Sequence, residues 1–149
     1  MTHEASDPTG KCPVAFGLDM FGDRWSLLII RDIVFKGKSH YSDFARSREK
    51  ISTNILANRL ARLESEGILS RRPDPANQTR RIYQLTEKGE GLIAVLLEII
   101  GWSAVHDPDN EGRSQIIDGA PADLLDRLRD DREALVADLI AAMHEAAAR

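Results

Sequence analysis

Cysteine is nearly absent from the chain, which has one, Cys12, among 149 residues. No disulfide can form within the chain, which favours a reducing compartment or a free thiol with its own role. Its four histidines, at positions 3, 40, 106 and 144, lack the spacing of metal ligands, and no phosphate loop or dinucleotide motif occurs. A Cys-His hydrolase would need a histidine near Cys12, and nothing in the sequence places one there. We therefore expect neither enzymatic activity nor a cofactor.

Long apolar segments are also scarce. No apolar run approaches the roughly 18 residues of a membrane span. No basic, apolar and small-residue pattern of a signal peptide opens the chain. We expect a cytoplasmic protein without a membrane partner, and its 42% hydrophobic residues can bury one core of ordinary size.

The net charge of −4 conceals a division along the chain. Residues 36–81 hold eleven Lys/Arg and five Asp/Glu, which gives a net charge of +6. Residues 92–149 hold five Lys/Arg and twelve Asp/Glu, which gives a net charge of −7. Because a polyanion responds to the local field, the basic half favours nucleic acid as a partner. The alternative is a mixed-charge surface with a chance asymmetry.

The first third of the chain predicts two helices. Pro13 suits a first helical position, which puts Cys12 near the N-cap of a helix with a buried stripe. Asp23 can cap a second helix, from Arg24 to about Phe35, that is apolar nearly all round and should be central. The stripe of the first helix would consist of Ala15, Leu18, Met20 and Phe21.

A helix-turn-helix pattern follows. We expect a short strand at 39–40, a brief helix over 41–48 and a turn at 49–51. Tyr41, Phe44 and Ala45 of the brief helix should face inward. Ser52 then caps a helix that ends at Gly67. Its core face would hold Ile55, Leu56, Leu60 and Leu63, and its opposite face Asn54, Ala57, Asn58 and Ala61, flanked by Thr53 and Arg62.

A hairpin and further helices complete the pattern. Residues 68–72 and 80–85 alternate like strands around a turn-rich 73–78. We expect Thr86 to cap a long apolar helix over 92–105, which is too apolar to stand without a partner. We predict a loose arm at 1–11, a linker at 106–120, and a last helix from Pro121 to about 148 with one stripe at 124, 128, 135, 139 and 143. That helix should extend a dimer surface or pack back on the domain; the alternative is a ligand pocket with Trp25 and Trp102.

Residues 12–105 resemble the HxlR-type winged-helix transcriptional regulators. The resemblance rests on Cys12-Pro13-Val14, Leu18-Asp19, Gly22-Asp23-Arg24-Trp25, Leu27 to Asp32, Ile51-Ser52, Leu56, Arg59-Leu60, Leu63-Glu64, Gly67-Ile68, Tyr83 to Thr86 and Gly89. It implies an α+β, mainly helical fold, namely a winged helix-turn-helix domain with additional N- and C-terminal dimerisation helices. It further implies a bacterial homodimer whose long helix after the wing joins the N-terminal helices at the interface, and which binds a near-palindromic operator.

The chain departs from the family pattern in two places. The family commonly has a proline-rich wing turn with an acidic residue before the Tyr-x-Leu-Thr element, but here the stretch is Asn77-Gln78-Thr79-Arg80-Arg81-Ile82. We therefore expect a more basic wing. Residues 107–149 extend beyond the familiar domain, and the resemblance assigns them no role.

The candidate DNA contacts follow from side-chain chemistry. Asparagine can pair with adenine, a threonine methyl can pack on thymine, and residues at a helix N-terminus can meet phosphate. Strand alternation puts Arg71 and Arg72, and likewise Arg80 and Arg81, on opposite faces, so only half of them can face one duplex. Arg59 either contacts phosphate or braces the fold against Asp43 or Glu64. The candidates are Ser52, Thr53, Asn54, Asn58, Arg59, Arg62, Arg72, Arg80 and Arg81.

The predicted function is a sequence-specific, homodimeric DNA-binding regulator, a repressor that responds to a small molecule, oxidant or electrophile. Cys12 is the candidate sensor, because a helix N-terminus favours a reactive thiolate. The alternative for Cys12 is a small apolar residue at an interface. The alternative for the whole chain is a winged-helix protein-interaction module without specific DNA binding.

Overall fold

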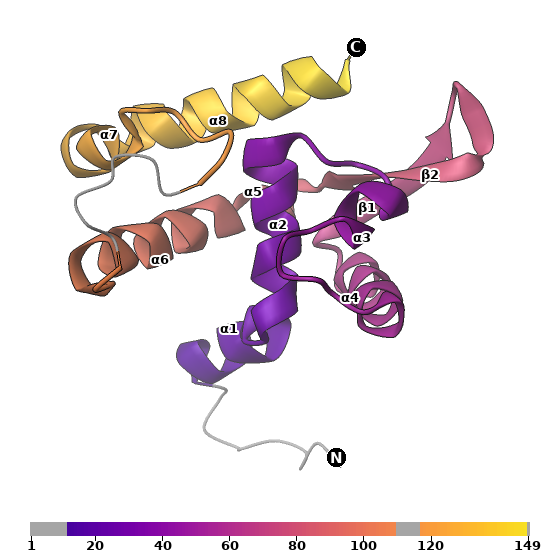
Figure 1. Cartoon of the computed structure of the whole chain (residues 1–149), viewed down its shortest axis with the longest axis horizontal. Coiled ribbons are helices and arrows are strands. Elements are labelled where there is room, and N and C mark those ends of the chain that lie inside the picture. Colours follow the sequence, from indigo (N-terminus) through magenta and orange to yellow (C-terminus); the bar gives the residue numbers. More distant parts are fainter. Residues whose placement is uncertain (1–11, 110–116, 149) are drawn as a thin grey trace.

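Helix α2 (Arg24–Lys36) occupies the centre of the computed structural model, which describes residues 12–109 and 117–148 (Figure 1). Its apolar side chains Ile29, Ile30, Ile33, Val34 and Phe35 are buried, as its all-round apolar sequence predicted. α2 contacts α1 (Pro13–Phe21) at its start, α4 (Thr53–Ser65) on one side, and α6 (Leu92–His106) and α8 (Arg132–Ala147) on the other. One core therefore joins both halves of the chain around this helix.

The helix-turn-helix and the hairpin lie together beside α2. α3 (Tyr41–Ala45) leads through a turn, in which Lys50 adopts a φ of 56°, to α4. α4 ends at Ser65, Gly67 follows with a φ of 74° that suits glycine, and β1 (Leu69–Asp74) begins two residues later. β1 pairs antiparallel with β2 (Asn77–Leu85) from Leu69↔Leu85 to Pro73↔Arg81, with an irregularity before Asp74. This arrangement is the predicted winged helix-turn-helix, mainly helical with a small two-stranded sheet.

The C-terminal segments cover the opposite side of α2. Thr86 caps the short α5 (Glu87–Glu90), and α6 follows after Gly91. α6 and α8 lie one above the other in Figure 1, and α7 (Leu124–Asp130) contacts both. Because Leu124, Leu128, Leu135 and Leu139 join the same hydrophobic core as α2 and α4, the extension packs back on the winged domain, one of the two predicted arrangements.

The structure corrects several local expectations. Residues 39–40 form no strand, although the Ser39 carbonyl accepts a hydrogen bond from the Tyr83 amide of β2. The wing turn is confined to 75–76, because both strands extend further than their alternating residues indicated. The predicted single C-terminal helix is two, interrupted at Asp131, whose carboxylate caps α8 by accepting from the Ala134 amide.

Four predicted core positions are exposed, which helical period could not reveal. Tyr41 and Ile55 are exposed at the margins of α3 and α4. α1 has no fully buried residue: Ala15 and Leu18 of the expected stripe are exposed, whereas Met20 packs in part against the core. In addition, α5 and α6 together form a stretch, Glu87–His106, that is long and apolar enough to cross a membrane by length and composition alone. The core helix of a soluble protein passes the same test, so this carries no assignment, but it does overturn the expectation that no such stretch exists.

Candidate nucleic-acid interface

The candidate interface is built on α4. Ser52 starts this helix as predicted, since its hydroxyl accepts a hydrogen bond from the Ile55 amide at 3.3 Å. Leu56, Leu60 and Leu63 are each at most 1% exposed and hold the helix against the core. This anchoring fixes which side of α4 faces outward.

The outward side of α4 carries the residues expected to read DNA. Ser52, Thr53, Asn54 and Asn58 are exposed, and so are the two alanines on that face, Ala57 and Ala61. The Tyr41 hydroxyl donates a 3.2 Å hydrogen bond to the Thr53 carbonyl oxygen, which ties α3 to the start of α4. The short side chains leave the helix backbone accessible to a groove, and the side chains of Thr53 and Asn54 can reach base edges. The side-chain oxygen of Asn58 accepts a 2.6 Å hydrogen bond from Arg59, which leaves its NH2 group as the donor for a base edge.

Arg59 and Arg62 hold α4 in place from within the protein. Arg59 Nε lies 2.8 Å from Asp23 Oδ2, and Arg62 donates to the Asp19 carbonyl oxygen at the end of α1. The bracing alternative for Arg59 is therefore the one observed, although its partner is Asp23 and not Asp43 or Glu64. Both arginines stay predicted DNA contacts, and in the free subunit their partners link the recognition helix to α1 and to the start of α2.

Asp23 is the centre of this linkage. Its carboxylate accepts hydrogen bonds from the amides of Trp25 and Ser26, from the Ser26 hydroxyl at 2.6 Å, and from Arg59. Partial burial raises the pKa of Asp23, but the hydrogen bonds from Ser26 and the charge of Arg59 outweigh burial, so the pKa lies below its usual value. A helix cap predicted from sequence thus also orients the recognition helix.

The wing arginines divide between the two faces of the hairpin, as strand alternation predicted. Arg71 pairs with Glu64 of α4 at 3.2 Å, whereas Arg72 donates to the side-chain oxygen of Gln84 on the other face. Arg80 donates to the Ser42 hydroxyl of α3 at 3.1 Å. Arg81 bonds only to main-chain oxygens near the wing tip, and both it and Arg80 are exposed.

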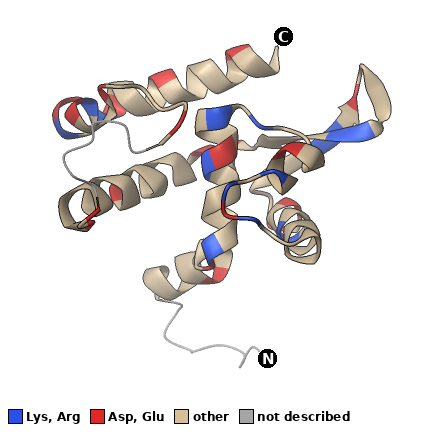
Figure 2. Cartoon of the chain, in the orientation of Figure 1, with Lys and Arg blue, Asp and Glu red and all other residues tan. Residues whose placement is uncertain are grey.

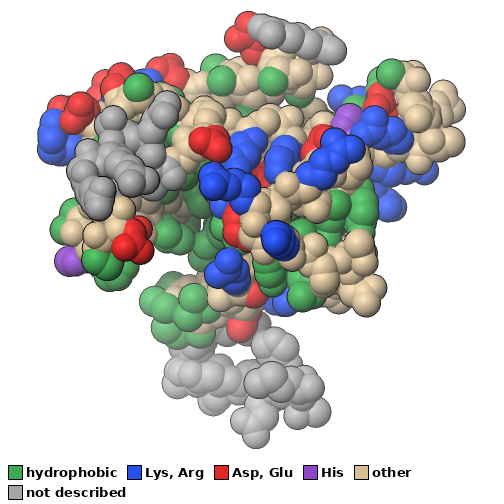
Figure 3. Space-filling view, viewed as in Figure 1, with side chains coloured by type: hydrophobic (Ala, Val, Ile, Leu, Met, Phe, Trp, Pro, Cys, Tyr) green, Lys and Arg blue, Asp and Glu red, His purple; other side chains and the backbone are tan. Residues whose placement is uncertain are grey.

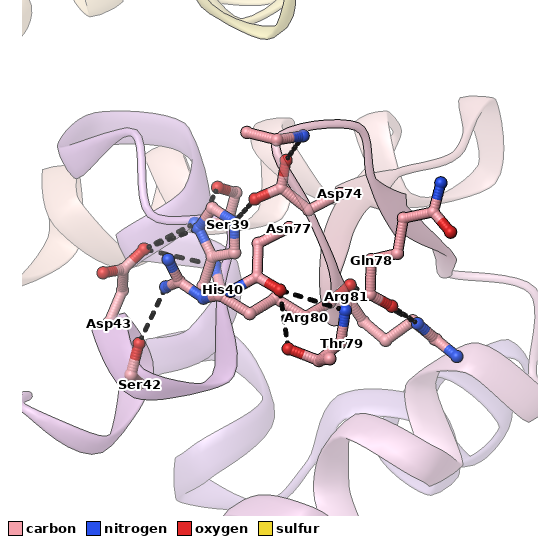
Figure 4. Close-up of polar contacts among 11 residues, drawn as sticks. Ser39, His40, Ser42, Asp43, Asp74, Asn77, Gln78, Thr79, Arg80 and Arg81 are labelled. Carbon is pink, nitrogen blue, oxygen red and sulfur yellow. Dashed lines mark hydrogen bonds and ion pairs between the residues drawn. The ribbon is translucent and has the colours of Figure 1, made fainter.

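A polar cluster that sequence reasoning missed holds the wing to the loop after α2 (Figure 4). His40 Nε2 lies 2.8 Å from Asp74 Oδ2, and the other oxygen of Asp74 accepts from the Ala76 amide in the wing turn at 2.9 Å. The Ala76 amide and His40 together hold the pKa of Asp74 below its usual value. Asp43 closes the cluster by accepting from the amides of Ser39 and His40. His40 and Asp74 lie 34 positions apart in the sequence, so only the fold brings them together.

Basic side chains surround the interface, as the division of charge predicted. Figure 2 shows Lys and Arg along the end of α2, the loops around α3 and the hairpin, with Asp and Glu more frequent on α7 and α8. In Figure 3 the basic side chains gather over this same region. Some are engaged within the protein, because Asp32 pairs with Lys38 at 3.1 Å and Glu49 with Arg31 at 2.6 Å. Arg46, Arg48 and Lys50 are exposed.

Large apolar side chains that the described residues leave exposed are grouped on α1 and on α6. Val14, Phe16 and Leu18 of α1 are 45–68% exposed, and Ile99, Trp102 and Val105 of α6 are 45–77% exposed. Green side chains mark α1 and the end of α6 in Figure 3. Large apolar residues grouped in this way indicate a surface that another protein covers.

Cys12 lies at the N-cap of α1, as predicted, and is exposed. Within the part of the chain that the structure describes, no side chain caps this helix end. Among residues 12–109 and 117–148 no group of three or more His, Cys, Asp or Glu could hold a metal ion. The structure shows Cys12 accessible to a reagent or to a second chain.

Comparisons with known proteins agree with this architecture. YodB of Bacillus subtilis, an HTH-type transcriptional regulator, is 34% identical over 93 residues, which are 62% of this chain and 82% of YodB. Its reduced form has a TM-score of 0.53 and covers 66% of this chain and 97% of that one, and YodB has also been solved diamide-treated and quinone-bound. The redox regulator HypR in its reduced form is 29% identical, with a TM-score of 0.56 over 68% of this chain and 99% of that one.

A third comparison covers the same part of the chain. The crystal structure of PA1607 is 37% identical, with a TM-score of 0.61, and covers 67% of this chain and 70% of that one. The model of the HxlR-like helix-turn-helix family matches residues 20–111, from the end of α1 through α6. The chain therefore belongs to the HxlR-like helix-turn-helix family of DNA-binding transcriptional regulators.

Proposed function

We propose that this regulator is a homodimeric repressor that reads its operator through the exposed face of α4 and the wing. The observation that carries the proposal is the face formed by Thr53, Asn54 and Asn58, which the protein leaves uncovered while burying the leucine face behind it. The exposed Arg81 stands on the wing, where it can reach phosphate or a minor groove. Arg80 can join it by releasing the Ser42 hydroxyl.

The apolar surfaces of α1 and α6 support the homodimer. These helices carry six large apolar side chains that are 45–77% exposed. Two copies related by a two-fold axis would bury them and place two α4 helices on one side of the duplex. Half-sites would then be centred about 34 Å apart, one helical turn of DNA, or somewhat further if the paired helices hold the domains apart.

A gel shift with the intergenic DNA flanking the gene, at several salt concentrations, tests DNA binding. If the dimer makes about eight phosphate contacts, a plot of the logarithm of the DNA-binding constant against the logarithm of salt concentration should have a slope of about −7, since each contact contributes about −0.9. Unrelated DNA of the same length is the control. The rival function, a protein-interaction module, predicts no specific band and no dependence on salt.

Cys12 supplies the proposed signal. It is exposed at a helix N-terminus on α1, one of the two helices proposed to form the dimer surface. An adduct, or a disulfide with the Cys12 of a second subunit, would alter this surface and so the spacing of the two recognition helices. The diamide-treated and quinone-bound structures of YodB support this class of signal for a family member. The alternative remains a cysteine that packs at the interface without reacting.

A further inference from the structure

A cavity of about 800 Å³ lies between the C-terminal helix α8 and the winged domain. Its walls are the end of α2 with the loop that follows, the hairpin, and the side of α8 that faces them. Neither Trp25 nor Trp102 lines it, so the predicted pocket at the tryptophans is not the one observed. The family match ends at residue 111, so the α8 wall is an addition to the part of the chain shared with the family.

The extension is fixed in position by close backbone packing. Gly119, with a φ of +87°, lies so near the main chain at Phe35 that a Cβ would overlap the Phe35 carbonyl oxygen. Leu135 and Leu139 then bury the base of α8 in the common core. The cavity therefore lies between two parts that pack closely and share one hydrophobic core.

The size and lining of the cavity suit a small organic molecule. Pockets of roughly 300–1,000 Å³ hold such ligands, and apolar walls with a few polar groups are typical of them. Ile33, Val34 and Phe35 of α2 and Leu139 and Met143 of α8 provide apolar walls on both sides. A flat ring system could lie between them.

Most of the charged side chains that line the cavity already have a hydrogen-bond or ion-pair partner within the protein. His40 pairs with Asp74, and His144 pairs with Glu90 at 2.6 Å. Arg127 pairs with Asp138, and Lys38 pairs with Asp32.

Arg72 differs from these paired groups. Its one hydrogen bond is to the neutral Gln84 amide at 3.3 Å, and no carboxylate within the part of the chain that the structure describes lies within ion-pair distance of it. A guanidinium offers five donors and binds carboxylates through two of them. An anion is therefore the ligand that completes this site.

We propose that the cavity binds an aromatic carboxylate, whose rings lie between α2 and α8 and whose carboxylate pairs with Arg72. This inference rests on the proposed function only in regarding the ligand as an effector of DNA binding. It reassigns Arg72, first considered a DNA contact, to the effector site on the opposite face of the hairpin from Arg71.

The cavity is connected to the wing. Asp74, which lines it, holds the wing turn through the Ala76 amide and the loop after α2 through His40 (Figure 4). A carboxylate paired with Arg72 would join α8 to the same hairpin. The ligand thus acts on the orientation of the wing, the part of the interface that carries Arg80 and Arg81.

Calorimetric titration of the full chain with 2-naphthoate and with its neutral isostere 2-naphthamide tests the site. The wild type should bind the acid at least about tenfold more tightly than the amide, because a charge-assisted pair contributes more than about 1.4 kcal/mol. Arg72→Met should abolish this preference while both compounds still bind. Equal binding of acid and amide by the wild type, or an undiminished preference in Arg72→Met, would overturn the proposal.

A second pair of variants locates the cavity independently of Arg72. Ala142 is exposed and lines the cavity, whereas Ala141 is exposed and does not. Ala142→Trp should fill the space and weaken 2-naphthoate binding at least about tenfold, and Ala141→Trp should leave it unchanged. Equal affinities in both variants would place the ligand elsewhere and refute the site.

A gel shift with and without 2-naphthoate separates the two proposals. Naphthoate binding without a specific DNA band would refute the proposed function and leave the site standing. A specific band from a protein that binds no naphthoate would refute the site alone. A band that naphthoate shifts in the wild type but not in Ala142→Trp supports both.

Discussion

Trp102→Glu should separate the proposed dimer into monomers that remain folded. Trp102 is 68% exposed in the subunit, and its ring contacts only the ring of His106 among the aromatic groups described. The substitution therefore removes little from the subunit's own core. It places a carboxylate in the centre of an apolar surface that a partner should cover.

The expected loss of dimerisation free energy follows from the exposed area of Trp102. Tryptophan buries up to about 250 Å², so the 68% exposed fraction corresponds to about 170 Å² and, at about 25 cal/mol per Å², to about 4 kcal/mol when a partner covers it. A two-fold interface contains the residue twice, which gives an upper estimate of about 8 kcal/mol. Even half of this loss would weaken dimerisation by about three orders of magnitude.

Sedimentation velocity over a range of micromolar concentrations measures the effect. Trp102→Phe, which retains an apolar ring, should remain dimeric, and Ala137→Glu, which adds the same charge on the exposed side of α8, should match the wild type. Circular dichroism should show the same helix content in all four proteins. An unchanged dimer dissociation constant for Trp102→Glu would refute the placement of α6 at the interface, and a monomeric wild type would refute the dimer itself.

Three further predictions concern DNA reading, sensing and stability. Asn58→Ala should relax sequence preference at one base pair by about 1–3 kcal/mol, whereas Arg81→Ala should weaken binding to all sequences and reduce the salt slope by about one. Competition gel shifts at two salt concentrations measure both effects, and identical behaviour of the two variants would contradict the assignment. Cys12→Ser should remove the response of operator affinity to diamide or quinone, and an identical response in wild type and variant would exclude the thiol. Since the pKa of Asp23 lies below its usual 3.8, its ion pair with Arg59 contributes stability above about pH 4 that is lost as the pH falls through the folded-state pKa. Asp23→Asn, which keeps the helix cap, should therefore be less stable than wild type in urea at pH 7, and the difference should shrink as the pH falls below 3.8 and through the folded-state pKa. A difference that stays constant with pH would contradict the linkage.

Sequence patterns were sufficient for features that depend on neighbours along the chain. Pro13 and Asp23 marked helix starts because an N-cap needs only the next few amides. The outward face of α4 followed from the positions of its leucines, since helical period fixes both faces at once. The opposite faces of Arg71 and Arg72 followed from strand alternation in the same way.

Sequence patterns were insufficient where the surroundings of a side chain depend on distant segments of the chain. The leucine period marked Ile55 as core, yet its side chain is 36% exposed at the margin of the buried face of α4. The predicted stripe of α1 is covered only in part, because Ala15 and Leu18 are exposed while Met20 packs against the core. The sequence left Arg59 open between a phosphate contact and bracing the fold, and only the structure shows Asp23 beside it, 36 residues away in sequence.

The sequence by itself determined a winged helix-turn-helix regulator, its reading helix and the division of charge, because period, caps and composition are local properties. Only the tertiary structure decided which arginines remain free, since ion-pair partners such as Asp23 and Arg59 come from distant segments. It also decided that the acidic C-terminal extension folds back on α2, where α8 and the hairpin line a cavity that contains Arg72. A cavity belongs to no single segment, and no pattern along one chain can show the space that two segments leave between them.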